Sequence, residues 1–151
     1  MLPVKKIICP TDFSDFSYKA LEVAEELCRE FGAQLCLIHV VTPIPKAMGS
    51  PTATGFDIPR YEEDLAEQSK KMLKRLIKER VAKSVKTEAE VVHGLEADSI
   101  VKMADEKDAD LIVIATHGHT GLKHLFLGSV AEKVLRHSAH PVLTIKAAED
   151  E

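Results

Sequence analysis

The sequence predicts one α/β domain over residues 1–151, in which a five-stranded parallel sheet of order 3-2-1-4-5 is covered on both faces by about four helices. Short apolar segments rich in β-branched residues alternate with longer segments whose apolar residues recur every three or four positions. Several short segments are almost uninterrupted apolar runs, which is typical of parallel strands covered by helices. No internal repeat, low-complexity tract or second zone of composition divides the chain. We therefore expect a single three-layer α/β/α unit.

Five segments have the composition of strands and are bounded by turn-forming residues. They are residues 4–10, 34–41, 87–93, 110–115 and 141–146. The second, fourth and fifth are the nearly continuous apolar runs that suit a sheet buried on both faces. Because a helical segment separates each strand from the next, successive strands are expected to be parallel and joined by crossovers.

Four segments have helical periodicity. Their apolar positions are Ala20, Leu21, Ala24, Leu27, Cys28 and Phe31; Tyr61, Leu65, Met72, Leu73, Leu76 and Ile77; Ile100, Val101 and Ala104; and Val130, Ala131, Val134 and Leu135. Gly32 is a natural C-terminal stop for the first helix. Ser129 and Glu132 have the spacing of a capping box, which predicts that Ser129 caps the last helix.

One segment, residues 42–59, is irregular and carries four prolines and two glycines. It is longer than most connections in compact domains. It is either a mobile flap or a functional lid, and the sequence leaves both interpretations open.

Composition excludes several classes of protein. The formal net charge of -4 is opposite to that of a general nucleic-acid binder and gives no attraction to an anionic membrane surface. Residues 1–10 contain no apolar segment long enough for a signal peptide or a membrane span. The three cysteines, Cys9, Cys28 and Cys36, form no CxxC pair, so we expect a reduced cytoplasmic setting in which they pack as small apolar residues.

Two polar clusters are predicted to meet at the carboxyl edge of the sheet. Pro10-Thr11-Asp12 follows the first strand, and Ala115-Thr116-His117-Gly118 follows the fourth. With the first strand central, the crevice of the sheet opens between these two strand ends. Gly118 and the helix start at Gly128-Ser129 would let backbone N–H groups approach an anion closely. The sequence therefore predicts a nucleotide site at this edge.

Several of these residues also have structural interpretations. Thr11, Asp12 or Ser14 could cap the first helix without any ligand, and Asp12 could equally accept from an adenine amino group, bind a ribose hydroxyl or hold a metal. Leu125, Phe126 and Leu127 are too apolar for a free loop and are expected to pack on the sheet or on a partner subunit.

The seven histidines of the chain raise the question of a metal site. His117 and His119, with His124 nearby, form one cluster, but the segment has no cysteine and zinc sites usually add one or a carboxylate. We therefore expect no metal site built by the protein, and loop histidines that face solvent or a phosphate. His39 and His93 alternate with apolar strand residues and are expected to be structural, whereas His137 and His140 are expected at the surface.

Other nucleotide and catalytic motifs are absent from the sequence. No Gly-Lys-Ser/Thr triplet opens a helix, and no GxGxxG follows the first strand. Ser129 lacks a GxSxG elbow. The third strand ends at His93-Gly94-Leu95-Glu96, without the acceptor aspartate of a phosphorylated receiver domain.

The chain resembles the ATP-binding branch of the universal stress protein family, which has the adenine nucleotide alpha hydrolase-like fold. The resemblance is carried by residues 7–14 and 37–40 and by the C-terminal third. The family's signature Gly-x2-Gly-x9-Gly-Ser/Thr stands here as Ala115-Thr116-His117-Gly118, nine residues, then Gly128-Ser129. Ala115 is the one departure, because the family pattern has glycine there.

The resemblance implies a role for each matching residue. Asp12 and Val40 would bind adenine, and Ala115 would line the ribose through its backbone. The full set of expected nucleotide-binding residues is Pro10, Thr11, Asp12, Val40, Ala115, His117, Gly118, His119, Gly128, Ser129, Val130 and Ala131. Mg²⁺ or Mn²⁺ would be held mainly by the phosphates of ATP. The edge strand 142–145 would pair across a two-fold axis in a homodimer.

Three functions are consistent with these observations. The first is a stress-response sensor or regulator that holds ATP without efficient turnover, since no catalytic base or arginine finger is evident. The second is a slow ATPase, or a protein that phosphorylates itself at Ser129 or Thr120. The third is a nucleotide-free dimerisation module, which Ala115 favours and the intact spacing from Gly118 to Ser129 opposes.

Overall fold

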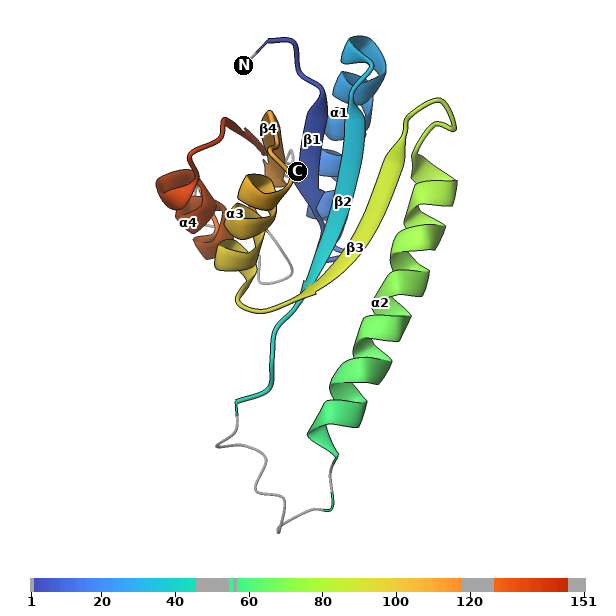
Figure 1. The fold of residues 1–151 in the computed structure, drawn as a ribbon, viewed down its shortest axis with the longest axis vertical. Helices are drawn as coiled ribbons and strands as arrows, with labels where there is room; N and C mark the ends of the chain where they lie inside the picture. Colours follow the sequence, from blue (N-terminus) through green and yellow to red (C-terminus); the bar gives the residue numbers. More distant parts are fainter. Residues whose placement is uncertain (1, 46–54, 56, 118–126, 147–151) are drawn as a thin grey trace, which may run out of the picture.

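The computed structural model describes residues 2–45, 55, 57–117 and 127–146. Strands and helices alternate along the chain, as the sequence predicts (Figure 1). The elements are β1 (Lys6–Pro10), α1 (Asp15–Phe31), β2 (Gln34–Val41), α2 (Ile58–Arg80), β3 (Thr87–His93), α3 (Glu96–Glu106), β4 (Leu111–Ala115), α4 (Ser129–His137) and β5 (Val142–Ile145). None of the described helices is long and apolar enough to cross a membrane.

The strands form one five-stranded sheet in the order β3-β2-β1-β4-β5, which confirms the predicted topology. All four pairings are parallel, and β1 lies between β2 and β4. The register aligns Ile8 of β1 with Cys36 on one side and with Ile112 on the other. All three residues are fully buried, so the hydrogen-bonded centre of the sheet is also the centre of the hydrophobic core.

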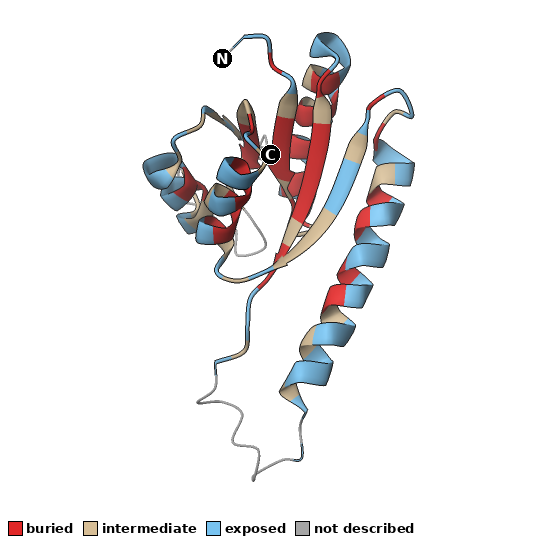
Figure 2. Ribbon diagram, in the orientation of Figure 1, coloured by how far each residue is buried: buried red, intermediate tan, exposed pale blue. Residues whose placement is uncertain are grey.

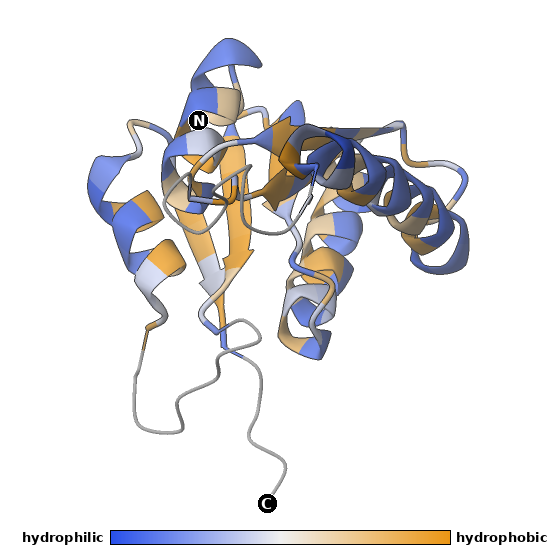
Figure 3. Ribbon diagram, turned by 90° about the horizontal axis from the view of Figure 1, so that it is seen from below, coloured by the Kyte–Doolittle hydropathy of each residue, from blue (hydrophilic) through white to orange (hydrophobic). Residues whose placement is uncertain are grey.

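The two faces of the sheet carry separate cores, because successive strand residues point to opposite sides. On one face α1 and α2 pack against Ile7, Leu37 and Val113. On the other face α3 and α4 pack against Ile38 and Ile114. Figure 2 shows the buried strands between the two helical layers, and Figure 3 shows the apolar strands enclosed by helices with hydrophilic outer surfaces.

Local chemistry sets the ends of the first two helices. Gly32 ends α1 in the left-handed conformation, with φ of 66°, and its N–H donates to the Cys28 carbonyl as expected for a glycine stop. Asp57 caps α2, since its side chain accepts from the Arg60 N–H. The irregular segment therefore ends at Asp57 rather than at Pro59, and its residues 46–54 and 56 lie outside the described part of the chain.

The predicted capping box at Ser129 is wrong. Ser129 is the first helical residue of α4, Gly128 occupies the cap position, and no side chain accepts a hydrogen bond there. Glu132, which was expected to bond back to the cap, pairs with Arg136 one turn further along instead, at 2.5 Å. The motif is one residue out of register, because the Gly128 carbonyl already accepts the first helical bond, from the Glu132 N–H.

The three cysteines are free and buried, as predicted. Burial raises the pKa of the Cys28 thiol to about 12 and that of Cys36 to about 11, because a thiolate is poorly solvated inside the core. Burial also raises the pKa of Cys9. All three therefore remain protonated and act as small apolar residues in the packing.

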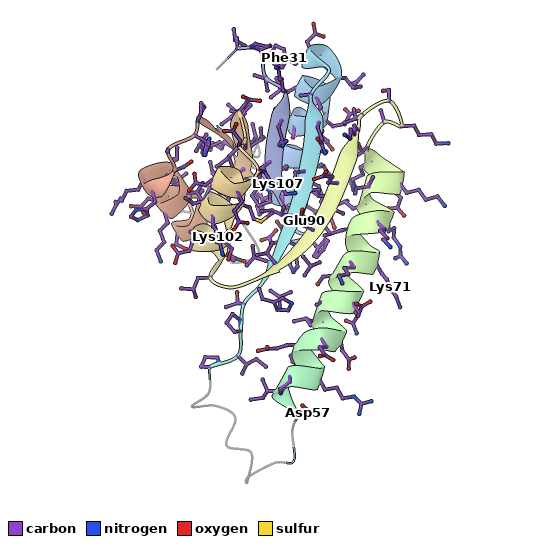
Figure 4. All side chains as sticks on the ribbon, in the orientation of Figure 1. Phe31, Asp57, Lys71, Glu90, Lys102 and Lys107 are labelled. Atoms are coloured by element: carbon purple, nitrogen blue, oxygen red, sulfur yellow. The ribbon has the colours of Figure 1, made fainter. Side chains whose placement is uncertain are left out.

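β3 is an edge strand, and charged side chains lie on the face that it shares with α3 and α4. Lys107, just after α3, forms ion pairs with Glu88 at 3.0 Å and with Glu90 (Figure 4). The Lys107 side chain is only 19% exposed, and the two carboxylates raise its pKa, so it stays cationic at neutral pH. A compact charged cluster thus lies on the exposed stretch of this strand.

The burial of Leu37 in the middle of β2 predicts that truncating its side chain lowers stability strongly. Leu37 is fully buried, so Leu37→Ala should lower the free energy of unfolding by about 2–5 kcal/mol. Urea unfolding followed by circular dichroism measures the difference. Leu2, which is 70% exposed, provides a matched control, and Leu2→Ala should change stability by less than about 0.5 kcal/mol. Equal effects of the two substitutions would contradict the assignment of the core.

Candidate functional site at the carboxyl edge of the sheet

A cavity of about 240 Å³ opens at the carboxyl ends of β1 and β4, where the sequence predicts the crevice. The chain leaves β1 towards β2 and leaves β4 towards β5, so the two strand ends diverge there. The lining residues are Pro10, Thr11, Asp12, Ser17, Val40, Glu96, Ile100, Ile114, Ala115, Thr116, His117, Gly128, Ser129, Val130 and Ala131.

The wall after β1 is held by a buried hydroxyl network. The Thr11 N–H donates to the Ile38 carbonyl at 2.8 Å, which extends the parallel pairing of β1 and β2 beyond the strand end. The Thr11 hydroxyl lies 2.8 Å from the Ser17 hydroxyl and accepts from the Phe13 N–H at 3.0 Å. Because Thr11 and Ser17 are both about 4% exposed, the network fixes the start of α1 relative to the sheet.

His39 supports the same wall from β2, in agreement with its predicted structural role. Its Nδ1 lies 2.8 Å from the Thr11 carbonyl oxygen. Its ring lies 4.5 Å from that of Phe13, centroid to centroid. Phe13 has φ of 63°, a conformation rare for a bulky residue, and these contacts keep it in place.

Asp12 closes a turn and also lines the cavity. Its Oδ1 accepts from the Ser14 N–H at 3.0 Å and from the Ser14 hydroxyl. Ser14 in turn caps α1, because its hydroxyl accepts from the Ser17 N–H at 3.2 Å. Of the three candidate caps, Ser14 is therefore the one that the structure uses. Ser14 thus caps the helix, and Asp12 lines the cavity.

The wall after β4 depends on a close approach of two backbone segments. The Gly128 N–H donates to the Thr116 carbonyl at 2.5 Å. A Cβ added to Gly128 would lie 2.7 Å from the same oxygen, closer than such contacts occur. Glycine is thus required here for space, although its φ of -67° is open to any residue.

The first turn of α4 presents unpaired donors at the cavity. The first helical bond runs from the Glu132 N–H to the Gly128 carbonyl, so the N–H groups of Ser129, Val130 and Ala131 have no partner within the helix. Among the described residues, no side chain caps them. The positive end of the helix dipole adds to these donors, which makes this wall suited to an anion.

Ala115 occupies the place of the family glycine without backbone strain. It ends β4 in register with Ile145, and its side chain packs against the core on the α1 face. Among the described residues other than glycine, only Phe13 and Asp108 have positive φ. Because Ala115 is extended, the conformation at this position does not require a glycine.

Glu96 is a cavity residue that the sequence reasoning missed. It is the first residue of α3, half-buried, and lies among the residues that line the cavity. Burial and the negative charge of Asp12 raise its pKa, while His39 opposes the shift. Two carboxylates, those of Asp12 and Glu96, therefore face the same cavity as the α4 donors.

Ten of the twelve predicted site residues line this one cavity. Gly118 and His119 lie outside the described residues, as do His124 of the metal hypothesis and the apolar pair Leu125 and Phe126. Sequence reasoning missed Ser17, Glu96, Ile100, Ile114 and Thr116. Two of these could have been found from the sequence, since Thr116 lies within the glycine motif and Ser17 lies in the first turn of α1. Nothing near Glu96 in the sequence indicates a site.

A cluster of side chains that could bind a metal lies on β2 and β3. Within the described parts of the chain, the one group of three whose ligand atoms lie within 4.8 Å of one another is Cys36, Glu88 and Glu90. This group lies on β2 and β3, away from the cavity, and Lys107 pairs with both of its carboxylates. His140, expected at the surface, instead contacts Asp105 at 2.8 Å with its side chain 18% exposed.

Comparison with known proteins gives a consistent result. The model of the universal stress protein family matches residues 3–146. Universal stress protein MJ0531 of Methanocaldococcus jannaschii is 39% identical, over 97% of this chain and 85% of that protein. Universal stress protein YxiE of Bacillus subtilis is 33% identical, over 93% of this chain and 98% of that protein.

Solved structures agree in fold. The structure of protein MJ0577 has a TM-score of 0.80 at 30% identity, over 97% of this chain and 99% of that one. A universal stress protein solved in complex with cAMP has a TM-score of 0.63 at 26% identity, over 96% of this chain and 98% of that one. Sequence, topology and family model all agree, and the chain belongs to the universal stress protein family.

Proposed function

We propose that this protein binds ATP as a stress-response sensor or regulator and does so without efficient turnover. The observation that carries the proposal is the chemical asymmetry of the cavity. One wall presents the carboxylates of Asp12 and Glu96, and another presents the unpaired N–H groups of α4. A nucleotide combines the matching groups in one molecule, since its nucleoside carries hydrogen-bond donors and its phosphates are anionic.

The phosphates would lie against the start of α4. The N–H groups of Ser129, Val130 and Ala131 are the donors, and the close packing of Gly128 on Thr116 leaves this turn without a side chain at its cap. The Ser129 hydroxyl is a further donor in the same wall. Gly118 and His119, which the family resemblance adds to this group, belong to the same proposal.

The base would lie between the apolar lining and Asp12. Val40, Ile100 and Ile114 provide the apolar contacts, and Pro10 continues that surface. Asp12 donates no proton when ionised, so it favours a base with an exocyclic amino group, such as adenine. The relative solved with cAMP binds an adenine nucleotide, which supports the same ligand class here.

A divalent cation would be held mainly by the phosphates. In the described part of the cavity no three metal-ligating side chains converge, which fits an ion that Mg²⁺-type chemistry leaves largely hydrated. Such an ion would neutralise phosphate charge. Efficient hydrolysis would need a base beside the attacking water, and Asp12 is already engaged by Ser14.

The setting proposed for this function is the cytoplasm. Three free, buried cysteines with no disulfide among them suit a reducing compartment. We also propose that residues 1–151 act as one domain.

The contact between Gly128 and Thr116 provides the main test. Gly128→Ala forces the start of α4 away from β4 and should lower ATP affinity at least about tenfold, measured by titration calorimetry with Mg²⁺. Gly32→Ala is the matched control: its φ of 66° makes alanine costly, but no atom lies within 4 Å and the cavity is remote. It should lower stability and leave affinity unchanged. No ATP binding by the unaltered protein, or unchanged affinity of Gly128→Ala, would refute the proposal.

A substitution can distinguish the proposed contact of Asp12 with the ligand from its structural role in the turn with Ser14. Asp12→Asn keeps one oxygen for the Ser14 N–H but cannot offer a second acceptor to the ligand. We expect weaker ATP binding and a smaller preference for ATP over GTP, both measured by calorimetry. Asp57→Ala, which removes the cap of α2 outside the cavity lining, should cost about 1 kcal/mol of stability with the ATP preference intact. Equal losses for ATP and GTP in Asp12→Asn would assign Asp12 to the turn alone.

We further propose a homodimer through the edge strand Val142–Ile145. β5 pairs only with β4 among the described strands, and Leu143 on it is 38% exposed. Pairing across a two-fold axis would satisfy the backbone groups of this edge and cover Leu143.

Light scattering should therefore give twice the mass of one chain. Leu143→Glu should yield monomers, because it places a charge in the proposed interface. Leu2→Glu, at a leucine that is 70% exposed, should remain dimeric. A monomeric unaltered protein, or a dimer that survives Leu143→Glu, would contradict the use of this edge.

A further inference from the structure

We propose that Glu96 determines specificity at the cavity by accepting a hydrogen bond from the nucleoside half of the ligand, either from a ribose hydroxyl or from the base amino group. This inference rests on the proposed nucleotide-binding function. Glu96 belongs to neither the glycine signature nor the strand ends from which the site was predicted, and it reaches the cavity from α3.

The position of Glu96 is fixed by the backbone that precedes it. The Gly94 N–H donates to the Val41 carbonyl at 3.1 Å, which ties the turn to the end of β2. Gly94 has φ of 153°, and a Cβ there would lie 2.6 Å from the Ser99 hydroxyl. The Ser99 N–H donates to the Leu95 carbonyl at 2.9 Å, which starts α3. Glu96 is therefore presented to the cavity from a well-defined turn, as a specificity residue requires.

Throughout the described residues, no hydrogen bond or ion pair to the Glu96 carboxylate is seen. The side chain is half-buried, and burial together with the charge of Asp12 raises its pKa, against the smaller effect of His39. A donor from a ligand would satisfy this carboxylate.

Charge decides which part of a nucleotide supplies the donor. An ionised carboxylate only accepts, and phosphate oxygens at neutral pH are acceptors that it repels. The phosphates instead match the unpaired N–H groups of α4. The donors left on an adenine nucleotide are the two ribose hydroxyls and the amino group, so Glu96 is matched to the nucleoside half.

The test is a cycle of protein and ligand changes measured by titration calorimetry. Unaltered protein, Glu96→Gln and Glu96→Ala are each titrated with ATP, 2′-deoxy-ATP, 3′-deoxy-ATP and purine riboside triphosphate, which lacks the amino group. We expect the unaltered protein to bind at least one of the three analogues about 10- to 100-fold more weakly than ATP, the range for a hydrogen bond to a charged group. Because Asp12 is also proposed to contact the amino group, the donor to Glu96 is identified by the analogue whose disadvantage disappears in Glu96→Ala.

Glu96→Ala should bind ATP more weakly by a similar factor and should no longer distinguish ATP from that same analogue. Glu96→Gln keeps one acceptor oxygen and should retain part of the discrimination. A loss of structure alone would lower affinity for all four nucleotides in parallel, so discrimination is the informative measurement. Asp98→Ala, an exposed acidic residue in the same helical turn and outside the cavity lining, should behave like the unaltered protein.

Two results would overturn the inference, and they differ. In the first, the unaltered protein and Glu96→Ala bind ATP equally or discriminate equally against every analogue. Glu96 then accepts no hydrogen bond from the ligand, and the proposed ATP-binding function stands. If the unaltered protein binds none of the four nucleotides, the proposed function fails and this inference fails with it.

Discussion

The divergence of the chain at the carboxyl ends of β1 and β4 is the constraint on which the rest of the site depends. β1 leads through α1 to β2, and β4 leads through α4 to β5, with α1 and α4 on opposite faces of the sheet. Within the described residues, a cavity lies in the gap between the two strand ends. Asp12 and the N–H groups of α4 reach the cavity because of this arrangement, since they follow a strand end or begin a helix at the gap.

The two sides of the gap are stabilised in different ways. The β1 side uses side chains: hydroxyls of Thr11, Ser14 and Ser17 bond to one another and to the backbone, and His39 holds the Thr11 carbonyl. On the β4 side, the short backbone contact of Gly128 with Thr116 joins the two segments, and the Thr116 hydroxyl lies 2.9 Å from His117 Nδ1. Side-chain bonds leave Asp12 on the β1 wall as an acceptor, whereas the backbone of the α4 turn provides donors. This difference in construction, together with Glu96 from α3, produces the chemical asymmetry of the cavity.

Strand and helix periodicity predicted the fold well, because each buried strand and each amphipathic helix is encoded locally. The same local reasoning located the strand ends at Pro10–Asp12 and Ala115–His117 and the helix start at Gly128–Ser129, since strand ends of a parallel sheet share one edge. The family resemblance added Val40, Val130 and Ala131. It failed at Ser129, where the spacing of a capping box does not reveal which carbonyl accepts the first helical bond. It missed Glu96 because only the packing of α3 against β2 brings that residue to the cavity. The positive φ of Phe13 likewise depends on tertiary contacts.

The charged cluster on β3 has a consequence for assembly. A sheet with two open edges can add copies without limit, and a head-to-tail contact that does not close produces filaments. Here the two edges differ: β5 carries apolar residues, while Glu88, Glu90 and Lys107 lie along β3. An incoming strand at β3 would have to desolvate these charges. If the protein dimerises through β5 as proposed, these charges would oppose strand addition at the other edge, and the assembly would stop at two chains.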